Sequence, residues 1–277
     1  MKTGALPNLI VIGAMKCGTT SLHRNLGLHP EIGMTERKEQ NFFLRKHWER
    51  HLDAYRAVIP TGFPVRGESS PDYSKVGPNP GVPARIAASL PDVKLVYMMR
   101  DPVERTVSHW VHFFASGVEM RPLEEALADL SDDNPLIDAS LYHKQLQAYL
   151  EHFPLERIHV ATMEGLSADP TRTMQELFGF LGVDDRFDSP TFHDVRHPSS
   201  KKRRATAIGR LARRLVGRYQ LNQLRRRAPF LDSWLRRDRV EKPEFPDALR
   251  SRLEDRFRDD VAHLRALTGL ACPKWSV

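Results

Sequence analysis

Residues 11–26 read VIGAMKCGTTSLHRNL, and this stretch predicts how the chain begins to fold. It starts in an apolar run that ends at Gly13, as in a buried parallel strand, and it ends with leucines at helical spacing. Gly13 and Gly18 have the spacing of the two glycines in the nucleotide-binding motif G-x-x-x-x-G-K-[ST]. In this chain, however, Thr19 replaces the lysine of that motif, and the lysine of the stretch, Lys16, lies three residues earlier inside the turn.

A turn between a strand and a helix predicts an anion site. The N–H groups of the turn and of the helix N-terminus converge on an anion in this geometry. The hydroxyl groups of Thr19, Thr20 and Ser21 could add donors, and Lys16 would reach the anion from within the loop. The alternative is an ordinary strand–helix turn in which the threonines cap the helix.

The rest of the chain continues this alternation of strands and helices. We expect strands at 8–13, 64–73 (a short strand, then a turn), 94–100 and 157–163, and helices at 19–30, 47–60, 85–90, 101–117, 141–153, 171–182 and 246–269. The pattern predicts an α/β fold with a mostly parallel central sheet flanked by helices. We expect a single domain over 1–277, in which 196–245 forms an irregular, basic excursion before the last helix.

A second strand–helix junction occurs in KLVYMMRDPVERTVSHW. Arg100 leaves the strand at its carboxyl end, and Ser108 lies about two helical turns further on. Two such junctions in one parallel sheet would place two anion sites at the same edge, and a nucleotide with two separated phosphates would fill both. The alternatives are that Arg100 pairs with Asp101 or Glu104 and that Ser108 is a solvated residue on the helix surface.

Composition narrows the class of protein. The chain is 40% hydrophobic and 28% charged, and it has no apolar run near the roughly 18 residues that a membrane span needs. The start, MKTGALPNLIVIGAM, has too short an apolar core for a typical signal peptide. The two cysteines, Cys17 and Cys272, imply no disulfide framework. These features predict a cytoplasmic protein.

The net charge of +7 comes from one segment. Eleven of the 42 Lys and Arg residues lie within 201–227, which contains no Asp or Glu, so the remaining chain has 31 basic and 35 acidic residues. A general nucleic-acid-binding surface is therefore not expected. The segment could be a basic amphipathic helix in peripheral contact with an anionic membrane, or a lid that attracts an anionic cofactor. We favour the lid.

Several motifs in order resemble one enzyme family. KCGTTSL and RDPVERTVSHW resemble the 5′-phosphosulfate loop and the 3′-phosphate motif of sulfotransferases that use 3′-phosphoadenosine 5′-phosphosulfate (PAPS). The resemblance continues in KEQNFF (38–43), GESSPDY (67–73), 149–183 and 246–275, and it is weakest in 196–245. The pattern is closest to carbohydrate sulfotransferases of the heparan-sulfate type and to their bacterial relatives.

The resemblance implies transfer of a sulfuryl group from PAPS to an acceptor hydroxyl by in-line displacement, with PAP as the product and no metal. Lys16 would stabilise charge on the bridging oxygen, and Arg100 and Ser108 would bind the 3′-phosphate. The residues that would surround the 5′-phosphosulfate are Lys16, Cys17, Gly18, Thr19, Thr20 and Ser21. RHPSSKKRR resembles the late nucleotide-contact loop only loosely, with Lys201, Lys202 and Arg203 as candidate contacts.

On the acceptor side, the resemblance selects Glu39 as the catalytic base, because the family's carboxylate precedes a Phe-Phe pair. The alternative is that Glu39 pairs with Lys38 or Arg37 on a solvated loop. Glu68 and Ser69 match positions near the acceptor. Many of the carbohydrate enzymes have lysine where this chain has Ser69, so a glycan, a glycolipid, a lipid alcohol and a small metabolite all stay open as acceptors.

Two other classes of function stay as alternatives. A P-loop-type small-molecule kinase would explain the glycines, although the position of Lys16 argues against it. A nucleic-acid or membrane-surface binder would use 201–227. None of the twelve histidines falls in a metal-ligand spacing. The oligomeric state is not indicated.

Overall fold

The computed structural model describes residues 4–194, 203–206, 212, 215, 236–239, 245–270 and 272–277. Its centre is a five-stranded sheet in the order β2-β3-β1-β4-β5, in which every neighbouring pair is parallel. The strands are β1 (Leu9–Gly13), β2 (Ile32–Met34), β3 (Val65–Ser69), β4 (Lys94–Met99) and β5 (Ile158–Thr162). The expected α/β fold with a mostly parallel sheet is confirmed.

The strand order defines where a ligand would bind. β1 lies in the middle, the chain moves from it to β3 and β2 on one side, and it then returns to β4 and β5 on the other. In such open sheets the crevice forms at the carboxyl ends of the strands, at the point where the strand order reverses. Here that point lies between β1 and β4, where both candidate anion-binding junctions begin.

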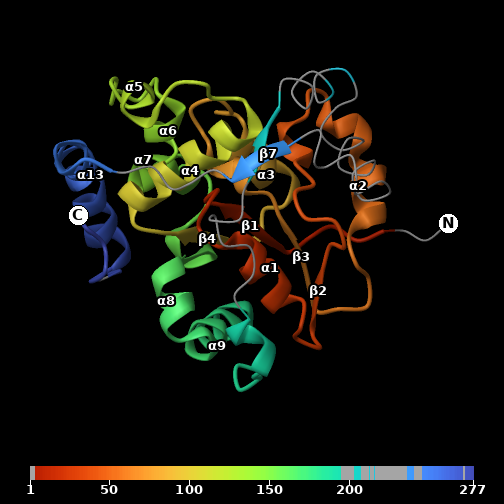
Figure 1. The fold of residues 1–277 in the computed structure, drawn as a ribbon. Helices are drawn as coiled ribbons and strands as arrows, with labels where there is room; N and C mark the ends of the chain where they lie inside the picture. The colour runs from red at the N-terminus through yellow and green to blue at the C-terminus, as the bar shows by residue number, and fades with distance from the viewer. Residues whose placement is uncertain are drawn as a thin grey trace.

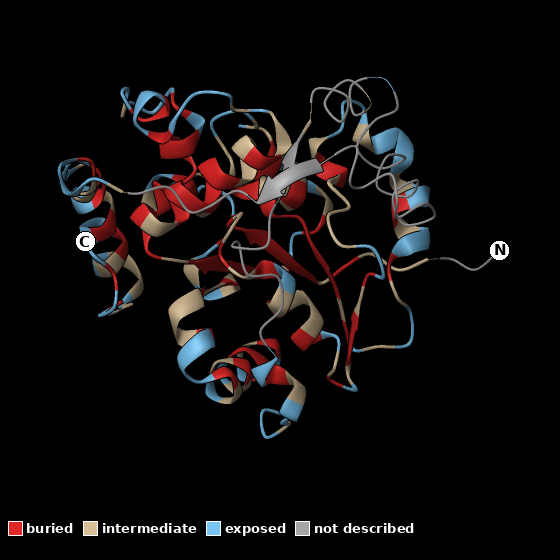
Figure 2. Cartoon of the chain, in the orientation of Figure 1, coloured by how far each residue is buried: buried red, intermediate tan, exposed pale blue. Residues whose placement is uncertain are grey.

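Helices cover both faces of the sheet (Figure 1). On one face lie α1 (Thr19–Leu26), α8 (Met163–Ala168) and α9 (Pro170–Leu181), and on the other lie α3 (Val82–Ser89), α4 (Pro102–Ser116) and α7 (Tyr142–Leu150). The strands β1, β3 and β4 between these layers are almost entirely buried, whereas the edge strand β5 is partly exposed (Figure 2). Their apolar side chains contact helices on both sides, which explains their continuous, non-alternating hydrophobic runs.

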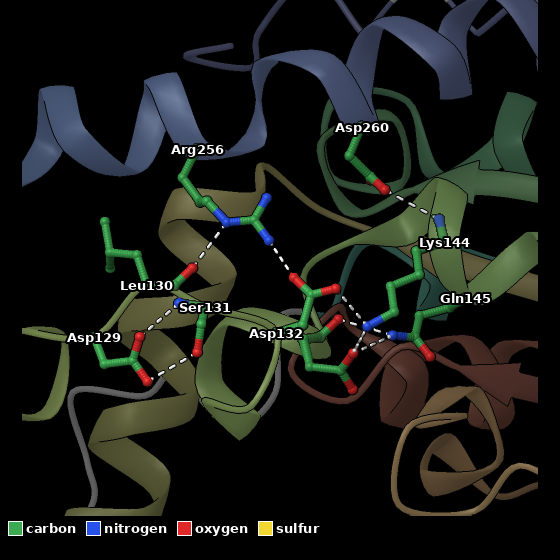
Figure 3. Close-up of polar contacts among 9 residues, drawn as sticks. Asp129, Leu130, Ser131, Asp132, Lys144, Gln145, Arg256 and Asp260 are labelled. Carbon is green, nitrogen blue, oxygen red and sulfur yellow. Dashed lines mark hydrogen bonds and ion pairs between the residues drawn. The ribbon is translucent and has the colours of Figure 1, made fainter.

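The helix α13 (Asp247–Thr268) packs against α7 and α4. One stripe of the helix is buried, with the residues Leu249, Leu253, Phe257, Val261 and Leu264 at helical spacing. Polar contacts fix the register of the helix. The Asp260 carboxylate accepts the backbone N–H of Lys144 at 3.0 Å (Figure 3). It also accepts the backbone N–H of His143 at 3.0 Å. Arg256 pairs with Asp132 and donates to the Leu130 carbonyl at 2.8 Å.

Shorter elements complete the described chain. They are α2 (Leu52–Val58), α5 (Leu123–Ala126), α6 (Pro135–Asp138) and the 3₁₀ turns Phe42–Leu44, Trp48–His51, Pro71–Ser74, Leu155–Arg157 and Pro190–His193. The helix expected at 47–60 is thus a 3₁₀ turn followed by α2, and the helix expected at 19–30 ends at Leu26. The three-residue strand β2 was not predicted, because so short a segment has no readable periodicity.

The basic excursion lies mostly outside the described residues. Within it, β6 (Arg203–Ala205) and β7 (Arg236–Arg239) form an antiparallel pair, and β6 lies against α4. The function of 196–245 as a lid stays a prediction. In the parts of the chain that the structure describes, no helix combines the length and the apolar character needed to cross a membrane.

Candidate active site

The loop between β1 and α1 leaves the N-terminus of a helix open. Gly18 precedes α1 in the left-handed conformation, with φ of 83°, and no side chain caps the helix. The alternative in which threonines cap this turn is therefore wrong. The first N–H groups of α1 have no intrahelical partner and can bind an anion. Thr20 and Ser21 reach the surface beside them, whereas Thr19 is buried.

Lys16 lies in the middle of this loop with φ of 77°, in a region that residues other than glycine rarely adopt. Gly13, at the start of the loop, is required for packing, since a Cβ atom there would lie 2.0 Å from the Ser74 hydroxyl oxygen. The two glycines that resemble a nucleotide motif thus have different functions. The first allows close packing, and the second allows the turn into α1.

The junction between β4 and α4 is built differently. The Asp101 side chain caps α4 by accepting the Glu104 N–H at 2.8 Å, and Pro102 occupies the first turn. Arg100 extends from the end of β4, and its Nη2 atom lies 3.3 Å from the Glu104 carboxylate. The ion pair considered as the alternative for Arg100 is therefore present. Ser108 is 7% exposed, so the alternative of a solvated helix surface is wrong.

A buried tyrosine joins the two junctions. The Tyr142 hydroxyl donates to the Arg100 carbonyl at 2.7 Å and lies 3.6 Å from the Cys17 sulfur atom. Next to it, the Ala14 N–H donates to the Met98 carbonyl at 2.5 Å. Tyr142 was not predicted from the sequence, although a tyrosine in a buried position needs a partner for its hydroxyl group. The two loops therefore form one unit, and a ligand that contacts one lies near the other.

Cys17 is not built as a nucleophile. Burial raises the pKa of its thiol to about 11, so the thiol stays protonated at neutral pH. The side chain packs inward, and the Cys17 N–H donates to the Ala14 carbonyl at 3.3 Å, so a contact of Cys17 with a cofactor stays a prediction.

Beneath the loop lies a buried arginine that the sequence analysis also missed. Arg105 is 0% exposed and donates to the Ser140 hydroxyl at 2.5 Å and to the Leu136 carbonyl at 2.7 Å. It also lies 3.2 Å from Nδ1 of His109. These contacts tie α4 to the segment before α7 and so fix the helix that carries Ser108.

The candidate base, Glu39, lies beside the carboxyl end of β3. Its backbone N–H donates to the Ser69 carbonyl at 2.8 Å, and the N–H of Asn41 donates to the Ser70 hydroxyl at 2.9 Å. The Glu39 carboxylate lies 3.2 Å from the Lys38 ammonium group, and the two side chains are 44% and 16% exposed. The pairing with Lys38 is thus present, and the carboxylate still reaches solvent at the edge where the loops meet.

Glu68 is completely buried. Its carboxylate accepts hydrogen bonds from the Tyr55 hydroxyl at 3.2 Å and from the Ser70 hydroxyl at 2.7 Å. Burial raises the pKa of Glu68 to about 6, although the hydrogen bonds and the positive charge of Lys38 oppose this. Glu68 therefore supports the segment that follows β3, and its function toward an acceptor stays a prediction.

Ser69 is paired with a histidine that the sequence analysis did not single out. Nε2 of His23 lies 3.1 Å from the Thr35 carbonyl, which can only accept, so Nε2 carries the hydrogen. Nδ1 then accepts from the Ser69 hydroxyl at 2.8 Å. Burial lowers the pKa of His23 to about 4. The neutral imidazole links α1 to the ends of β2 and β3, and the acceptor contact of Ser69 stays a prediction.

Three candidate cofactor contacts, at positions 201–203, stay predictions. Lys201 and Lys202 lie outside the described residues, and Arg203 is described only as the start of β6. Among the described residues, no group of three or more His, Cys, Asp or Glu side chains is arranged to hold a metal ion.

Comparison with known proteins identifies the class. The family model of the sulfotransferase domain matches residues 6–265. The chain therefore belongs to the sulfotransferase domain family, and the resemblance of its motifs to this class of enzymes is confirmed.

Among individual proteins, the chain is 32% identical over 187 residues to heparan sulfate glucosamine 3-O-sulfotransferase 3B1 of Mus musculus. The alignment covers 64% of this chain and 46% of that protein, so the match spans about half of the relative's length. A bifunctional heparan sulfate N-deacetylase/N-sulfotransferase 1 of Caenorhabditis elegans is 26% identical over 211 residues, which are 71% of this chain and 24% of that protein. The crystal structure of a sulfotransferase from Alicyclobacillus acidocaldarius has a TM-score of 0.71 at 25% identity, and the comparison covers 99% of this chain and all of that one.

Proposed function

We propose that this chain transfers a sulfuryl group from PAPS to a hydroxyl group of a carbohydrate acceptor. The observation that carries the proposal is the pair of unlike anion sites on adjacent strands. The uncapped N-terminus of α1 offers backbone N–H groups, whereas the β4–α4 junction offers the side chains of Arg100 and Ser108. A nucleotide with separate 5′ and 3′ phosphate groups fits two such sites.

The residues present fit this donor. The N–H groups at the start of α1, with Thr20 and Ser21, would hold the 5′-phosphate, and Arg100 would exchange the Glu104 carboxylate for the 3′-phosphate. The Ser108 hydroxyl group, which has no hydrogen-bond partner among the described residues, would donate to the same phosphate. When bound, PAPS supplies a sulfuryl group whose bond to the bridging oxygen breaks, leaving the electron pair on PAP, while sulfur bonds to the acceptor oxygen.

Two side chains of this chain would assist that exchange. Lys16 places an ammonium group in the loop, where it would stabilise negative charge developing on the bridging oxygen. The Glu39 carboxylate would take the proton of the acceptor hydroxyl, a step that typically contributes about 10²–10⁴-fold to the rate. The ammonium group of Lys38, 3.2 Å away, pairs with this carboxylate at the edge of the site.

The acceptor class rests on the relatives. Two relatives from Mus musculus at 32% identity are named heparan sulfate glucosamine 3-O-sulfotransferases, and the region they share with this chain extends over 64% of it. A sugar hydroxyl is a weak acid that stays protonated at neutral pH, so its attack on sulfur would be helped by a carboxylate base such as Glu39. The cytoplasmic location stays a prediction.

The test is a screen of acceptors with radiolabelled PAPS and the wild-type chain. It compares N-sulfated and desulfated heparan-type oligosaccharides with a lipid alcohol and a phenol, and Lys16→Ala serves as the inactive control. We expect transfer to an oligosaccharide, and a loss of that transfer in Glu39→Gln with PAP affinity unchanged. Transfer to the lipid alcohol alone would contradict the carbohydrate assignment, and failure to bind PAP or PAPS would contradict the whole proposal.

A further inference from the structure

A second lysine reaches the donor loop from another part of the chain. Lys75 follows the 3₁₀ turn Pro71–Ser74 after β3, and its Nζ atom lies 3.0 Å from the sulfur atom of Met15. Met15 immediately precedes Lys16. The Lys75 side chain is only 17% exposed, so its ammonium group is held against the loop rather than extended into solvent.

Two further groups fix the position of this ammonium group. The Asp72 carboxylate lies 2.7 Å from Nζ of Lys75, and the Phe113 ring centroid lies 5.9 Å from it. Phe113 belongs to α4, the helix that carries Ser108. Lys75 is therefore held between the donor loop and α4, and its largely desolvated charge requires such partners to be tolerated.

Lys75 and Lys16 act on the same region. Burial lowers the pKa of His109 well below its usual value, and the positive charges of Arg105, Lys75 and Lys16 lower it further. Lys16 itself makes no hydrogen bond or ion pair within the described parts of the chain. Lys75 and Lys16 thus place two ammonium groups beside the loop, and the Asp72 carboxylate pairs with the first of them. An ammonium group without an ion-pair partner among the described residues suits an anionic ligand.

The pair Asp72–Lys75 resembles the pair Glu39–Lys38 in its exposure. The lysines are 17% and 16% exposed, and the carboxylates are 40% and 44% exposed. The difference lies in what each lysine contacts. Lys38 lies beside the candidate base, whereas Lys75 contacts the donor loop.

The direction of approach indicates which part of the donor Lys75 would meet. The N–H groups that would hold the 5′-phosphate lie at the Gly18 end of the loop, where α1 begins. Lys75 contacts the opposite end, at Met15. With the 5′-phosphate held at the Gly18 end, a group bound at the Met15 end would lie next to Lys16, where the proposed donor would place its sulfuryl group.

We infer that Lys75 is a second ammonium group of the sulfuryl-transfer site, donating hydrogen bonds to the sulfuryl oxygens, and that Asp72 is its positioning residue. The inference rests on the proposed function. Lys75 follows the 3₁₀ turn after β3 and lies outside the motifs that resemble the family.

The experiment compares two ligands that differ only in the sulfuryl group. Binding of PAPS and of PAP is measured by calorimetry without acceptor for the wild type, Lys75→Met, Lys75→Arg and Asp72→Asn, with the exposed Lys274→Met as the matched control. We expect Lys75→Met to weaken PAPS binding at least tenfold more than PAP binding. Lys75→Arg should restore most of the difference, Asp72→Asn should show a smaller version of it, and Lys274→Met should show none.

Each other outcome overturns the inference. Equal losses for PAPS and PAP would assign Lys75 to the phosphate or to the shape of the loop. Unchanged affinities with a lower melting temperature would make Lys75 structural, and unchanged affinities with a raised acceptor KM would place it at the acceptor. If the wild type binds neither ligand, the proposed function fails first, which distinguishes the two failures.

Discussion

The two strand–helix junctions at the carboxyl edge of the sheet differ in the groups that they present to an anion. α1 starts at Gly18 with no side-chain cap and no acidic residue in its first turn. α4 starts after Asp101, whose side chain caps the helix, and Glu104 lies in its first turn. In the proposed site, the open N-terminus of α1 would bind an anion directly through its N–H groups, whereas the self-capped start of α4 would rely on the side chains of Arg100 and Ser108.

Removing Lys16 should give the largest effect, because it acts at the open junction where charge develops. We expect Lys16→Ala to raise the activation free energy by about 2.7–4 kcal/mol, which lowers kcat about 100- to 1,000-fold. The measurement is single-turnover sulfuryl transfer at saturating donor. PAP affinity should fall much less, since backbone N–H groups hold the phosphate. A drop in PAP affinity as large as the drop in kcat would mean that the open helix end contributes little.

His23 tests what holds the open helix in place. The pKa of His23 is lowered from 6.5 to about 4, so the unfolded chain binds the proton more tightly than the folded protein does. His23 therefore contributes stability that is complete above pH 6.5 and is lost as the pH falls toward 4, by about 3 kcal/mol. Denaturant unfolding of the wild type and of His23→Gln across this range measures the contribution.

Glu68 acts in the opposite direction and is the internal control. Its pKa is raised from 4.5 to about 6, so its contribution to stability decreases as the pH rises through that interval. The His23→Gln variant should keep the decrease in stability with rising pH that Glu68 causes, and it should lose the increase that His23 causes. If the two proteins have parallel stability curves from pH 4 to 6.5, His23 does not stay neutral in the folded state.

Arg100 tests the self-capped junction. We expect Arg100→Ala to weaken PAP binding by about 1.5–3 kcal/mol, since a charge-assisted contact would be lost. Adenosine 5′-phosphosulfate, which lacks the 3′-phosphate, should be affected only slightly. Glu104→Gln is the matched control: it removes the carboxylate that Arg100 pairs with at 3.3 Å, so PAP binding should tighten. Equal losses for both ligands in Arg100→Ala would make Arg100 a structural residue.

Of these substitutions, Asp101→Ala should change PAP affinity least. Asp101→Ala removes the cap of α4 and the contact with the Ser276 N–H, which lies 2.5 Å away. We expect the free energy of unfolding to fall by about 1 kcal/mol for the cap alone, with PAP affinity unchanged within twofold. A strong loss of PAP affinity without a loss of stability would show that the start of α4 binds phosphate directly, and the contrast between the junctions would disappear.

Much of the fold could be predicted from the sequence, because its signals are local. The runs LIVIG (9–13) and LVYMM (95–99) contain no charged residue and do not alternate with polar residues, a pattern typical of strands buried on both faces. Gly18 indicated a turn into a helix, which its φ of 83° confirms. β2 and the β6–β7 pair escaped prediction since strands of three or four residues are defined by their neighbours and not by periodicity.

The candidate site was predicted less completely, for a related reason. The loops that contain Lys16, Arg100 and Glu39 follow strands or resemble family motifs, so their sequence indicated them. Tyr142 and Lys75 come from segments far along the chain and reach the loop only through the packing of α7 and of the turn after β3. No pattern within a single segment contains that information.

The central claim is that the two junctions together bind one nucleotide with separate 5′ and 3′ phosphates. Calorimetric titration of the wild-type chain with PAP in the presence of EDTA tests it most directly, with ATP–Mg²⁺ and adenosine 5′-phosphosulfate as comparison ligands. We predict micromolar binding of PAP without metal, weaker binding of adenosine 5′-phosphosulfate, and no comparable binding of ATP–Mg²⁺. Tight binding of ATP–Mg²⁺ with no binding of PAP would contradict the claim.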